Sequence, residues 1–581
     1  MESISEAVTR QTSISGPVKQ KARANWLSDV KKVSLPFFLA VPLFVVNNLA
    51  ILSGWLNPPP GYLPAKMIRA QDTALYLSWV NAYQTQNLAP NFAAPWKNEP
   101  AFFNGFMWLL AKFCKWTGLE IPVGRLLFHF LFYVLAAYAL FFAVRVFTES
   151  ASEFWAAFLV IICSVPLPSL AVLPAMITGK ISPLVGAGYF VWFSSDGFFH
   201  GIGGSILVTF GTATTLLAFS LLAKYIKTEQ RKFLVYSALV AFLSALVHAT
   251  EIFLIAGAGS LALLWWRGRE WRKAVPEIGA FALAGFLGLA PYVLMALRYE
   301  WFRDLAQQSR WQLPHSPVEV FLSLGLPAML MLALLVIRPR MTTYTDRLLQ
   351  CWVVVALIGI YLPIMPSPQH LLDGFYYAAA ILLVRQLTTN YLHIRAYKIA
   401  PGLITAAVGG ICLLSVTAYG SYYRQSYRDG RAVRPERLFS AVMSQDEVEV
   451  KQWMRQNAKS DQLVLAPAEH SSALLSVPMH SFAGHWHWSL TYNEQAELAE
   501  RFFNGSLDSV SADQMLANYG IRYVVVPKDS PAIAYLGDYT RRITLGSLTI
   551  YESAANEMKP YQQRNINPSQ KLEAALNSTG Y

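Results

Sequence analysis

Charged residues are scarce in this chain of 581 residues. Lysine, arginine, aspartate and glutamate together make up only 14% of it, whereas 54% is hydrophobic and 14% is aromatic. A soluble protein of this size carries about 25% charged residues. The shortage excludes a disordered chain, a coiled coil and an ordinary soluble enzyme. The apolar residues instead form blocks long enough to cross a bilayer, whose ~30 Å hydrocarbon core requires about 20 helical residues.

Cysteine is also scarce, with four residues in the whole chain. Cys163, Cys351 and Cys412 lie inside apolar blocks, and Cys114 lies in a loop segment. No CxxC pair is present, which excludes a disulfide framework and a cysteine metal site. No internal repeat is visible either, so the sequence gives no support to an inverted-repeat transporter.

The apolar blocks predict an all-α polytopic membrane protein with about 11 transmembrane helices. Their bounds are approximately 35–55, 121–147, 154–175, 201–226, 232–248, 250–266, 276–297, 318–337, 347–365, 371–388 and 401–423. The run from Lys232 to Arg267 has basic clusters at both ends. One helix would put these clusters on opposite faces of the membrane, whereas two short helices meeting near His248 put both inside. We therefore expect two helices there.

The formal net charge of +12 comes from basic residues in short loops between apolar blocks. This placement is typical of membrane orientation by the positive-inside rule, and it argues against nucleic acid as a partner. The basic loops are 224–232, 267–273, 338–347 and 385–398. With these loops inside, residues 1–34 form a cytoplasmic tail, and the first apolar block, which no cleavage pattern follows, is an anchor.

The same topology divides the chain into domains. Residues 35–423 form a transmembrane domain that includes an outer loop, 56–120, and residues 424–552 form an extracytoplasmic α/β domain. Helical spacing from Asp446 and from Asn493 to Phe503, with strand patterns at 462–466 and 521–527, supports the α/β prediction. Residues 553–581 are polar, and we expect them to be disordered. In the outer loop, residues 102–113 predict a surface helix too short to span the membrane.

Two acids in the outer loop are candidate catalytic residues. Asp72 and Tyr76 lie one helical turn apart and therefore share a face. Asp72 could act as a general base or hold a divalent cation, Mg²⁺ or Mn²⁺, against a phosphate; its structural alternative is an acid favoured by a helix N-terminus. Glu99 has the same two interpretations, because Pro100 is expected to begin the next helix.

Three histidines near outer helix ends are candidate phosphate or metal contacts. His200 precedes a glycine-rich segment, which could instead serve close helix packing. His248 and Glu251 share a face, where a mutual hydrogen bond competes with metal binding. His370 and Asp373 lie in a loop that suits a phosphate or a simple helix start.

Further cations, among them Arg303 and Arg310, face outward, where lipid headgroups are their alternative partners. In the tail, His485 and His487 would alternate onto one face of a strand, an arrangement that suggests metal, although no third ligand lies close by.

The order of these features resembles the GT-C superfamily of integral membrane glycosyltransferases, close to bacterial mannosyltransferase-like membrane proteins. The resemblance covers about 35–530. Its membrane part rests on the early acid pair, the outer histidine, the short helix pair and the segment Gln369–Gly374. Its tail part rests on Ser481–Trp486, the helix ending at Gly505 and the strand region Tyr519–Val526.

The resemblance implies inverting sugar transfer from a polyprenyl-phosphate-linked donor to a glycan, lipid or protein acceptor on the non-cytoplasmic face of a bacterial inner or plasma membrane. Asp72 would be the catalytic acid residue, Glu99 would assist at the acceptor or the metal, and His200 and the loop around His370 would face the donor phosphate.

This chain departs from the family where many members carry paired arginines, because His370, Leu371 and Leu372 stand there. Either the phosphate contact then falls to His370, Arg303 or Arg310, or the donor differs. Two other functions remain open from the sequence. One is a lipid or polysaccharide transporter, and the other is a non-catalytic envelope protein that binds glycan.

Overall fold

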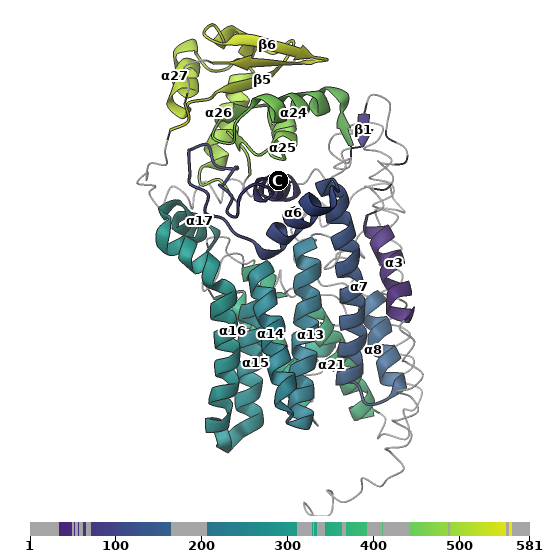
Figure 1. Ribbon diagram of the computed structural model, residues 1–581. Coiled ribbons are helices and arrows are strands. Elements are labelled where there is room, and N and C mark those ends of the chain that lie inside the picture. Colours follow the sequence, from purple (N-terminus) through teal and green to yellow (C-terminus); the bar gives the residue numbers. More distant parts are fainter. Residues whose placement is uncertain are drawn as a thin grey trace, which may run out of the picture.

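A computed structural model describes residues 34–48, 62–64, 71–163, 206–310, 330–333, 343–362, 368–391 without 373, 442–553 without 486–487, and 557–559, together with a few isolated positions. The predicted cytoplasmic tail, the span at 401–423, His200, Asp373 and His487 lie outside these residues. The described part is mostly helical, with a small sheet near the C-terminal end (Figure 1).

Apolar helices of different lengths form a bundle that makes up the lower part of Figure 1. Its helices are α3 (Ser34–Asn47), α7 (Ile121–Phe147), α8 (Ala151–Cys163), α13 (Ile206–Thr228), α14 (Arg231–Val247), α15 (Glu251–Arg267), α16 (Trp271–Arg298), α20 (Tyr344–Gly359) and α21 (Phe375–Tyr391). Among the described residues, three helical segments are long and apolar enough to cross a membrane: Ile121–Phe147, Ile206–Thr228 and Glu251–Arg298. The last comprises α15 and α16 with the short 3₁₀ turn η2 (Gly268–Glu270) between them.

The two-helix prediction for residues 232–267 is confirmed. The helix α14 ends at Val247 and α15 begins at Glu251, so the break falls at His248–Thr250. Both helices pack against α16, and Gly288 of α16 is needed there because a Cβ would lie 2.5 Å from the Cβ of Ala245. The described helices therefore agree with the prediction at this point, although the expected total of about 11 spans extends over residues that the structure does not describe.

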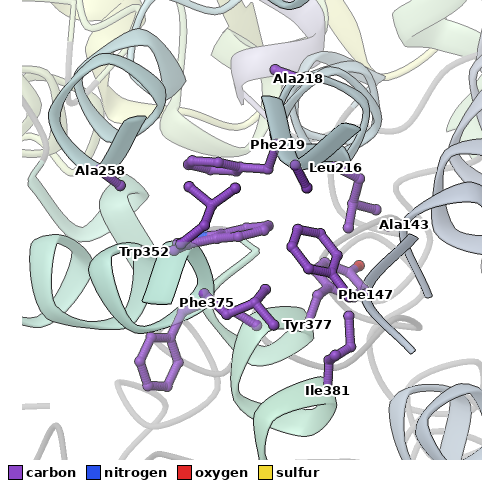
Figure 2. Packing of buried hydrophobic residues seen from close by; sticks show 14 of the residues in the cluster. Ala143, Phe147, Leu216, Ala218, Phe219, Ala258, Trp352, Phe375, Tyr377 and Ile381 are labelled. Carbon is purple, nitrogen blue, oxygen red and sulfur yellow. The ribbon is translucent and has the colours of Figure 1, made fainter. Parts of the chain in front are cut away.

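Buried aromatic and small side chains fill the bundle core. Phe219 of α13 stacks on Trp352 of α20 with ring centroids 4.2 Å apart, and Phe375 and Tyr377 of α21 lie below them (Figure 2). All four are almost fully buried. Close packing of this kind fixes α13, α20 and α21 against one another.

Outer-loop elements lie across one end of the bundle. They are the strand β1 (Tyr62–Pro64) and the helices α5 (Gln71–Tyr83) and α6 (Gly105–Thr117), and α17 (Glu300–Arg310) continues from α16 at the same end (Figure 1). The expected surface helix is therefore present as α6. The prediction that Pro100 begins it is wrong, because Asn104 caps α6 by accepting a hydrogen bond from the Met107 amide. The first amides of a helix have no partner within the helix, and the Asn104 side chain supplies one for Met107. A proline side chain has no acceptor that could do the same.

The tail forms an α/β domain above the outer loop, as the sequence predicts. Its mixed five-stranded sheet has the order β4–β3–β5–β7–β6, with β3, β4 and β5 parallel and the β5–β7 and β6–β7 pairs antiparallel. The strands are β3 (Leu463–Leu465), β4 (His480–Ser481), β5 (Tyr523–Pro527), β6 (Thr540–Leu545) and β7 (Leu548–Glu552). The helix α24 (Gln445–Asn457) packs on one face through Val450 and Met454, and α26 (Tyr492–Phe503) and α27 (Ser509–Tyr519) cover the other; the short α25 (Ala468–Leu474) also contacts α24.

Two expectations for the tail are corrected. His485 is not on a strand, because β4 ends at Ser481. The chain also stays packed past residue 552. Ser553 and Met558 are buried, and the Lys97 amide donates to the Lys559 carbonyl at 2.7 Å. The expectation of disorder from residue 553 is therefore wrong for these residues.

Hydrogen bonds to backbone atoms hold the tail domain and the outer loop together. The strand β1 pairs antiparallel with β2 (Val442–Ser444). The Ser481 amide donates to the Phe92 carbonyl at 3.0 Å, and Asn91 Nδ2 donates to the Trp488 carbonyl at 2.8 Å. Such bonds between distant chain segments fix the domain directly over the end of the bundle that the loop 56–120 covers.

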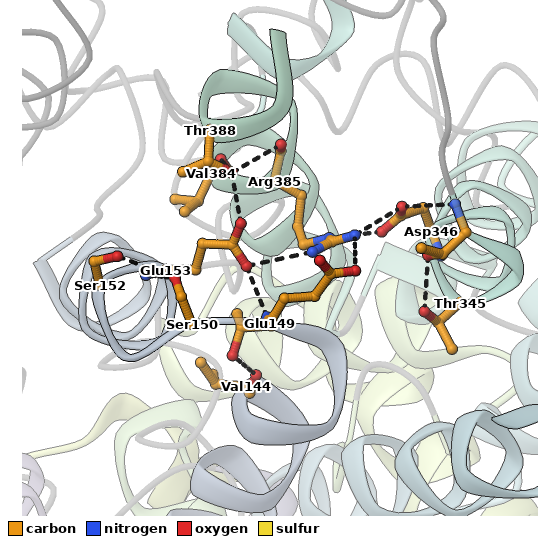
Figure 3. Close-up of polar contacts among 12 residues, drawn as sticks. Val144, Glu149, Ser150, Ser152, Glu153, Thr345, Asp346, Val384, Arg385 and Thr388 are labelled. Carbon is orange, nitrogen blue, oxygen red and sulfur yellow. Dashed lines mark hydrogen bonds and ion pairs between the residues drawn. The ribbon is translucent and has the colours of Figure 1, made fainter. Parts of the chain in front are cut away.

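The opposite end of the bundle carries the described basic loops and a buried ion-pair network. Arg385 of α21 is 4% exposed; it binds Asp346 of α20 at 2.8 Å, Glu149 at 3.1 Å and Glu153 of α8 at 3.3 Å (Figure 3). Thr388 also donates to Glu153 at 2.8 Å. A buried arginine with three acids joins the helix ends of α8, α20 and α21.

Candidate functional site

A buried histidine–carboxylate pair lies at the break between α14 and α15. His248 Nδ1 is 2.6 Å from Glu251 Oε1 and 2.8 Å from Oε2, and Thr250 Oγ1 donates to Oε2 at 3.2 Å. Glu251 is fully buried, and the His248 side chain is 15% exposed. Of the two alternatives for this pair, the described contacts are those of the mutual hydrogen bond.

The contact fixes how the imidazole is presented. A carboxylate only accepts hydrogen bonds, so His248 Nδ1 carries the hydrogen that it donates to Glu251. Nε2 is then the ring atom that can accept from or donate to a bound group. At many functional histidines a carboxylate accepts a hydrogen bond from one ring nitrogen and so fixes the orientation of the ring, as Glu251 does here.

Gly211 of α13 makes room for the Glu251 carboxylate. A Cβ at residue 211 would lie 2.1 Å from Glu251 Oε1 and 2.6 Å from its Cδ. Only glycine therefore allows the buried acid to sit between α13 and α15 at this height.

We expect Gly211→Ala to displace Glu251 and to lower the free energy of unfolding by about 1–3 kcal/mol, as overpacking of a buried site does. Gly279→Ala is the matched control, because Gly279 lies in helix α16 with open space around it. Alanine there is expected to be neutral or stabilising. Thermal unfolding in nanodiscs checks both, and equal midpoints for the two variants would contradict the expectation.

His370 approaches this pair from a segment far along the chain. It lies in the 3₁₀ turn η3 (Pro368–Leu372), and its ring meets that of His248 edge to face with centroids 5.4 Å apart. Leu371 and Leu372 are 4% and 1% exposed, and Leu371 packs against Gly359. The structure thus brings together two predicted site residues, His248 and His370, and buries both leucines in the core.

Asn104 ties the outer loop to the helix that ends beside His248. Its Nδ2 donates to the Val247 carbonyl at 2.8 Å and lies 3.3 Å from Tyr292 Oη, and its amide donates to Tyr83 Oη at 3.2 Å. Sequence reasoning missed Asn104. Its signal was an asparagine directly before an amphipathic helix, which is a common N-cap pattern.

The three candidate residues of the outer loop are Asp72, Tyr76 and Glu99. Asp72 is the second residue of α5, in its first turn, and its side chain is outside the described residues. Tyr76 is half-buried and stacks on Trp79, with centroids 5.8 Å apart. Glu99 is exposed in a loop ahead of α6, so it does not lie at the helix N-terminus that was expected for it.

The remaining cations lie on α17. Arg303 is exposed; its Nη2 is 3.7 Å from Glu300 Oε1, and its Nη1 is 3.5 Å from the Leu297 carbonyl. Arg310 is the last residue of the helix, and its side chain is not described. Among the residues with described side chains, no group of three histidine, cysteine, aspartate or glutamate residues could hold a metal ion.

Comparison with solved structures defines the fold class. The chain resembles an arabinofuranosyltransferase, AftD, from Mycobacteria, with a TM-score of 0.50, 14% identity, and coverage of 90% of this chain and 40% of that one. An R1389S mutant of AftD gives a TM-score of 0.51. The chain therefore shares the fold of this solved arabinofuranosyltransferase, and the predicted resemblance to GT-C proteins is confirmed at the level of the fold.

A second solved protein is similar over more of its own length. The oligosaccharyltransferase of Archaeoglobus fulgidus matches with a TM-score of 0.44 and 13% identity, over 90% of this chain and 75% of that one. No family model and no curated protein matches the sequence. This chain spans about 40% of the length of AftD.

Proposed function

We propose that this protein is a membrane glycosyltransferase. It moves a sugar from a polyprenyl-phosphate-linked donor to a glycan, lipid or protein acceptor, with inversion, on the non-cytoplasmic face of a bacterial inner or plasma membrane. The observation that carries the proposal is the position of the His248–Glu251 pair and His370, together at the bundle end that the outer loop and the tail domain cover.

Three features support this function. The fold is the GT-C fold. The described basic residues around Arg267 and Arg385 lie at the bundle end opposite the tail domain, which fits a cytoplasmic basic end and an outer site. A lipid-linked donor also explains why the site lies at the ends of the membrane helices. The phosphate of such a donor stays at the level of the lipid headgroups, while its polyprenyl chain stays in the bilayer.

In the proposed reaction Asp72 is the general base or the ligand of a divalent cation, Mg²⁺ or Mn²⁺. The acceptor hydroxyl oxygen attacks the anomeric carbon, and the bond from that carbon to the phosphate oxygen breaks. The polyprenyl phosphate leaves with the electron pair, and the hydroxyl proton passes to the base. Glu99 assists at the acceptor, and Tyr76, His200, His248, His370, Asp373, Arg303 and Arg310 are the candidates for holding the donor.

Replacement of Asp72 by Asn tests the proposal. We expect transfer to fall by about 10²–10⁴-fold, because the amide neither takes the proton nor binds a cation as a carboxylate does. The assay uses radiolabelled polyprenyl-phosphate sugars and a membrane extract as acceptor, in nanodiscs, with EDTA followed by Mg²⁺ or Mn²⁺.

The matched control is Asp513→Asn, which changes an exposed acid on α27 and should leave transfer unchanged. Equal transfer by wild type and Asp72→Asn would remove Asp72 from the mechanism. A wild-type protein that is folded but silent with every donor would contradict the transferase proposal itself.

A further inference from the structure

A row of buried polar side chains runs down helix α7 from its outer end. Arg125, His129 and Tyr133 follow at intervals of four residues, so they lie on one face of the helix. They are 6%, 1% and 1% exposed. His129 Nε2 is 3.2 Å from Thr209 Oγ1, so the row faces α13.

Arg125 is the member of this row that has no described partner. None of the described side chains forms a hydrogen bond or an ion pair with it, and no described charged group lies close enough to act on it. The nearest acid in sequence, Glu120, instead acts on Arg455 of the tail domain.

The elements packed against α7 offer few acids. They are α3, α5, α6, α8 and α13, and among them only α5 and α8 carry an acidic residue. The α8 acid, Glu153, is bound to Arg385 at the other end of the bundle. The α5 acid is Asp72, whose side chain is not described.

Arg385 shows what a structural arginine looks like in this protein. It is buried to a similar degree, 4% exposed, and three acids surround it. A buried charge without such a partner costs folding free energy, so it indicates a site that an anion completes.

The position of Arg125 suits an anion at headgroup level. The helix begins at Ile121, so Arg125 is four residues, or about 6 Å, from its outer end. A long helical side chain leans toward the helix N-terminus, which here is the end covered by the outer loop. The guanidinium can therefore reach a phosphate at the outer surface of the bundle.

We propose that Arg125 binds the phosphate of a polyprenyl-phosphate lipid. The proposal rests on the proposed function. Arg125 would supply the positive charge that is missing where Leu371 and Leu372 replace the paired arginines of the resembled family. A guanidinium binds a phosphate through two parallel N–H donors, which a lone histidine cannot offer.

Binding of decaprenyl phosphate to the full-length protein in phosphatidylcholine nanodiscs tests this proposal. Arg125→Met is expected to weaken binding at least about 10-fold, while Arg125→Lys keeps the charge and loses less. Arg145→Gln, on the same helix at the opposite end, should bind as wild type does. Without ligand, Arg125→Met should be as stable as wild type or more so, a result that a paired structural arginine would not give.

Several results would overturn the proposal. Unchanged decaprenyl phosphate affinity in Arg125→Met would do so, and so would a lower melting temperature of that variant without ligand, since it would reveal a structural partner. Binding of uncharged decaprenol with the same affinity would show that the phosphate is not recognised. Equal Arg125-dependent binding of phosphatidic acid would make this a general headgroup site.

The outcome is separable from that of the proposed function. If sugar transfer depends on Asp72 but Arg125→Met binds decaprenyl phosphate normally, the transferase proposal stands and the Arg125 site is rejected. If binding depends on Arg125 but the protein transfers no sugar, the Arg125 site stands and the transferase proposal is rejected.

Discussion

Replacing Arg385 by Met is expected to lower the free energy of unfolding by about 3–5 kcal/mol, the cost of leaving buried charges without their partner. Asp346 and Glu153 are 3% and 8% exposed, and both lose the guanidinium that they share. The substitution weakens the packing of α8, α20 and α21 against one another, because the ion-pair network joins these three helices at one end of the bundle.

Equilibrium unfolding in mixed detergent–SDS micelles measures this loss. Arg272→Met is the matched control, because Arg272 is exposed at the same end of the bundle and should change stability little. Adding Asp346→Asn and Glu153→Gln to Arg385→Met should recover part of the stability. A combined variant no more stable than Arg385→Met alone would show that unpaired carboxylates are not the cause.

The second large effect is a loss of stability in mild acid that comes from His480. This residue is 1% exposed on β4, and its Nδ1 donates to the Ala94 carbonyl of the outer loop at 2.8 Å. Burial lowers the pKa of His480 to about 4, whereas an unfolded histidine has a pKa of about 6.5. The folded protein therefore resists a proton that the unfolded chain accepts.

The sign of the pH effect follows from these two pKa values. The free energy of unfolding is unaffected above about pH 6.5, falls as the pH decreases toward 4, and levels off below that. At pH 5 the loss is about 2 kcal/mol. Since His480 joins the tail domain to the outer loop, we expect acid to loosen this junction.

His480→Asn isolates the contribution, because an asparagine Nδ2 can donate to the same carbonyl but does not titrate. Thermal unfolding from pH 7.5 to 4.5 should show a smaller acid-induced decrease for this variant than for wild type. His480→Leu, which loses the bond, should be less stable throughout that range. Identical pH profiles for wild type and His480→Asn would assign the acid sensitivity to other groups.

The sequence by itself determined the local elements of this protein. Apolar runs longer than a bilayer core gave the helices α7 and α13, and the basic clusters at both ends of Lys232–Arg267 predicted the break at His248. The β-branched run before Pro527 predicted the strand β5. These features could be read because hydrophobic length, charge placement and strand propensity act within one segment of chain.

Part of the candidate site could be predicted as well. His248 and His370 both stand beside helix ends that the sequence predicts to face outward, and the predicted topology places such ends at one height. Their contact itself is tertiary, since packing of α15 against η3 and α20 brings the rings to 5.4 Å. The start of α6 was misplaced because the Asn104 cap is stabilised by Val247, 143 residues away.

Only the tertiary structure decided which charges have partners. In the sequence, Arg125 and Arg385 are both arginines within or beside apolar runs, and nothing local distinguishes them. Arg385 meets acids as much as 236 residues away, whereas no described acid reaches Arg125. The free energy of a buried charge depends on its neighbours in space, and long-range helix packing sets those neighbours.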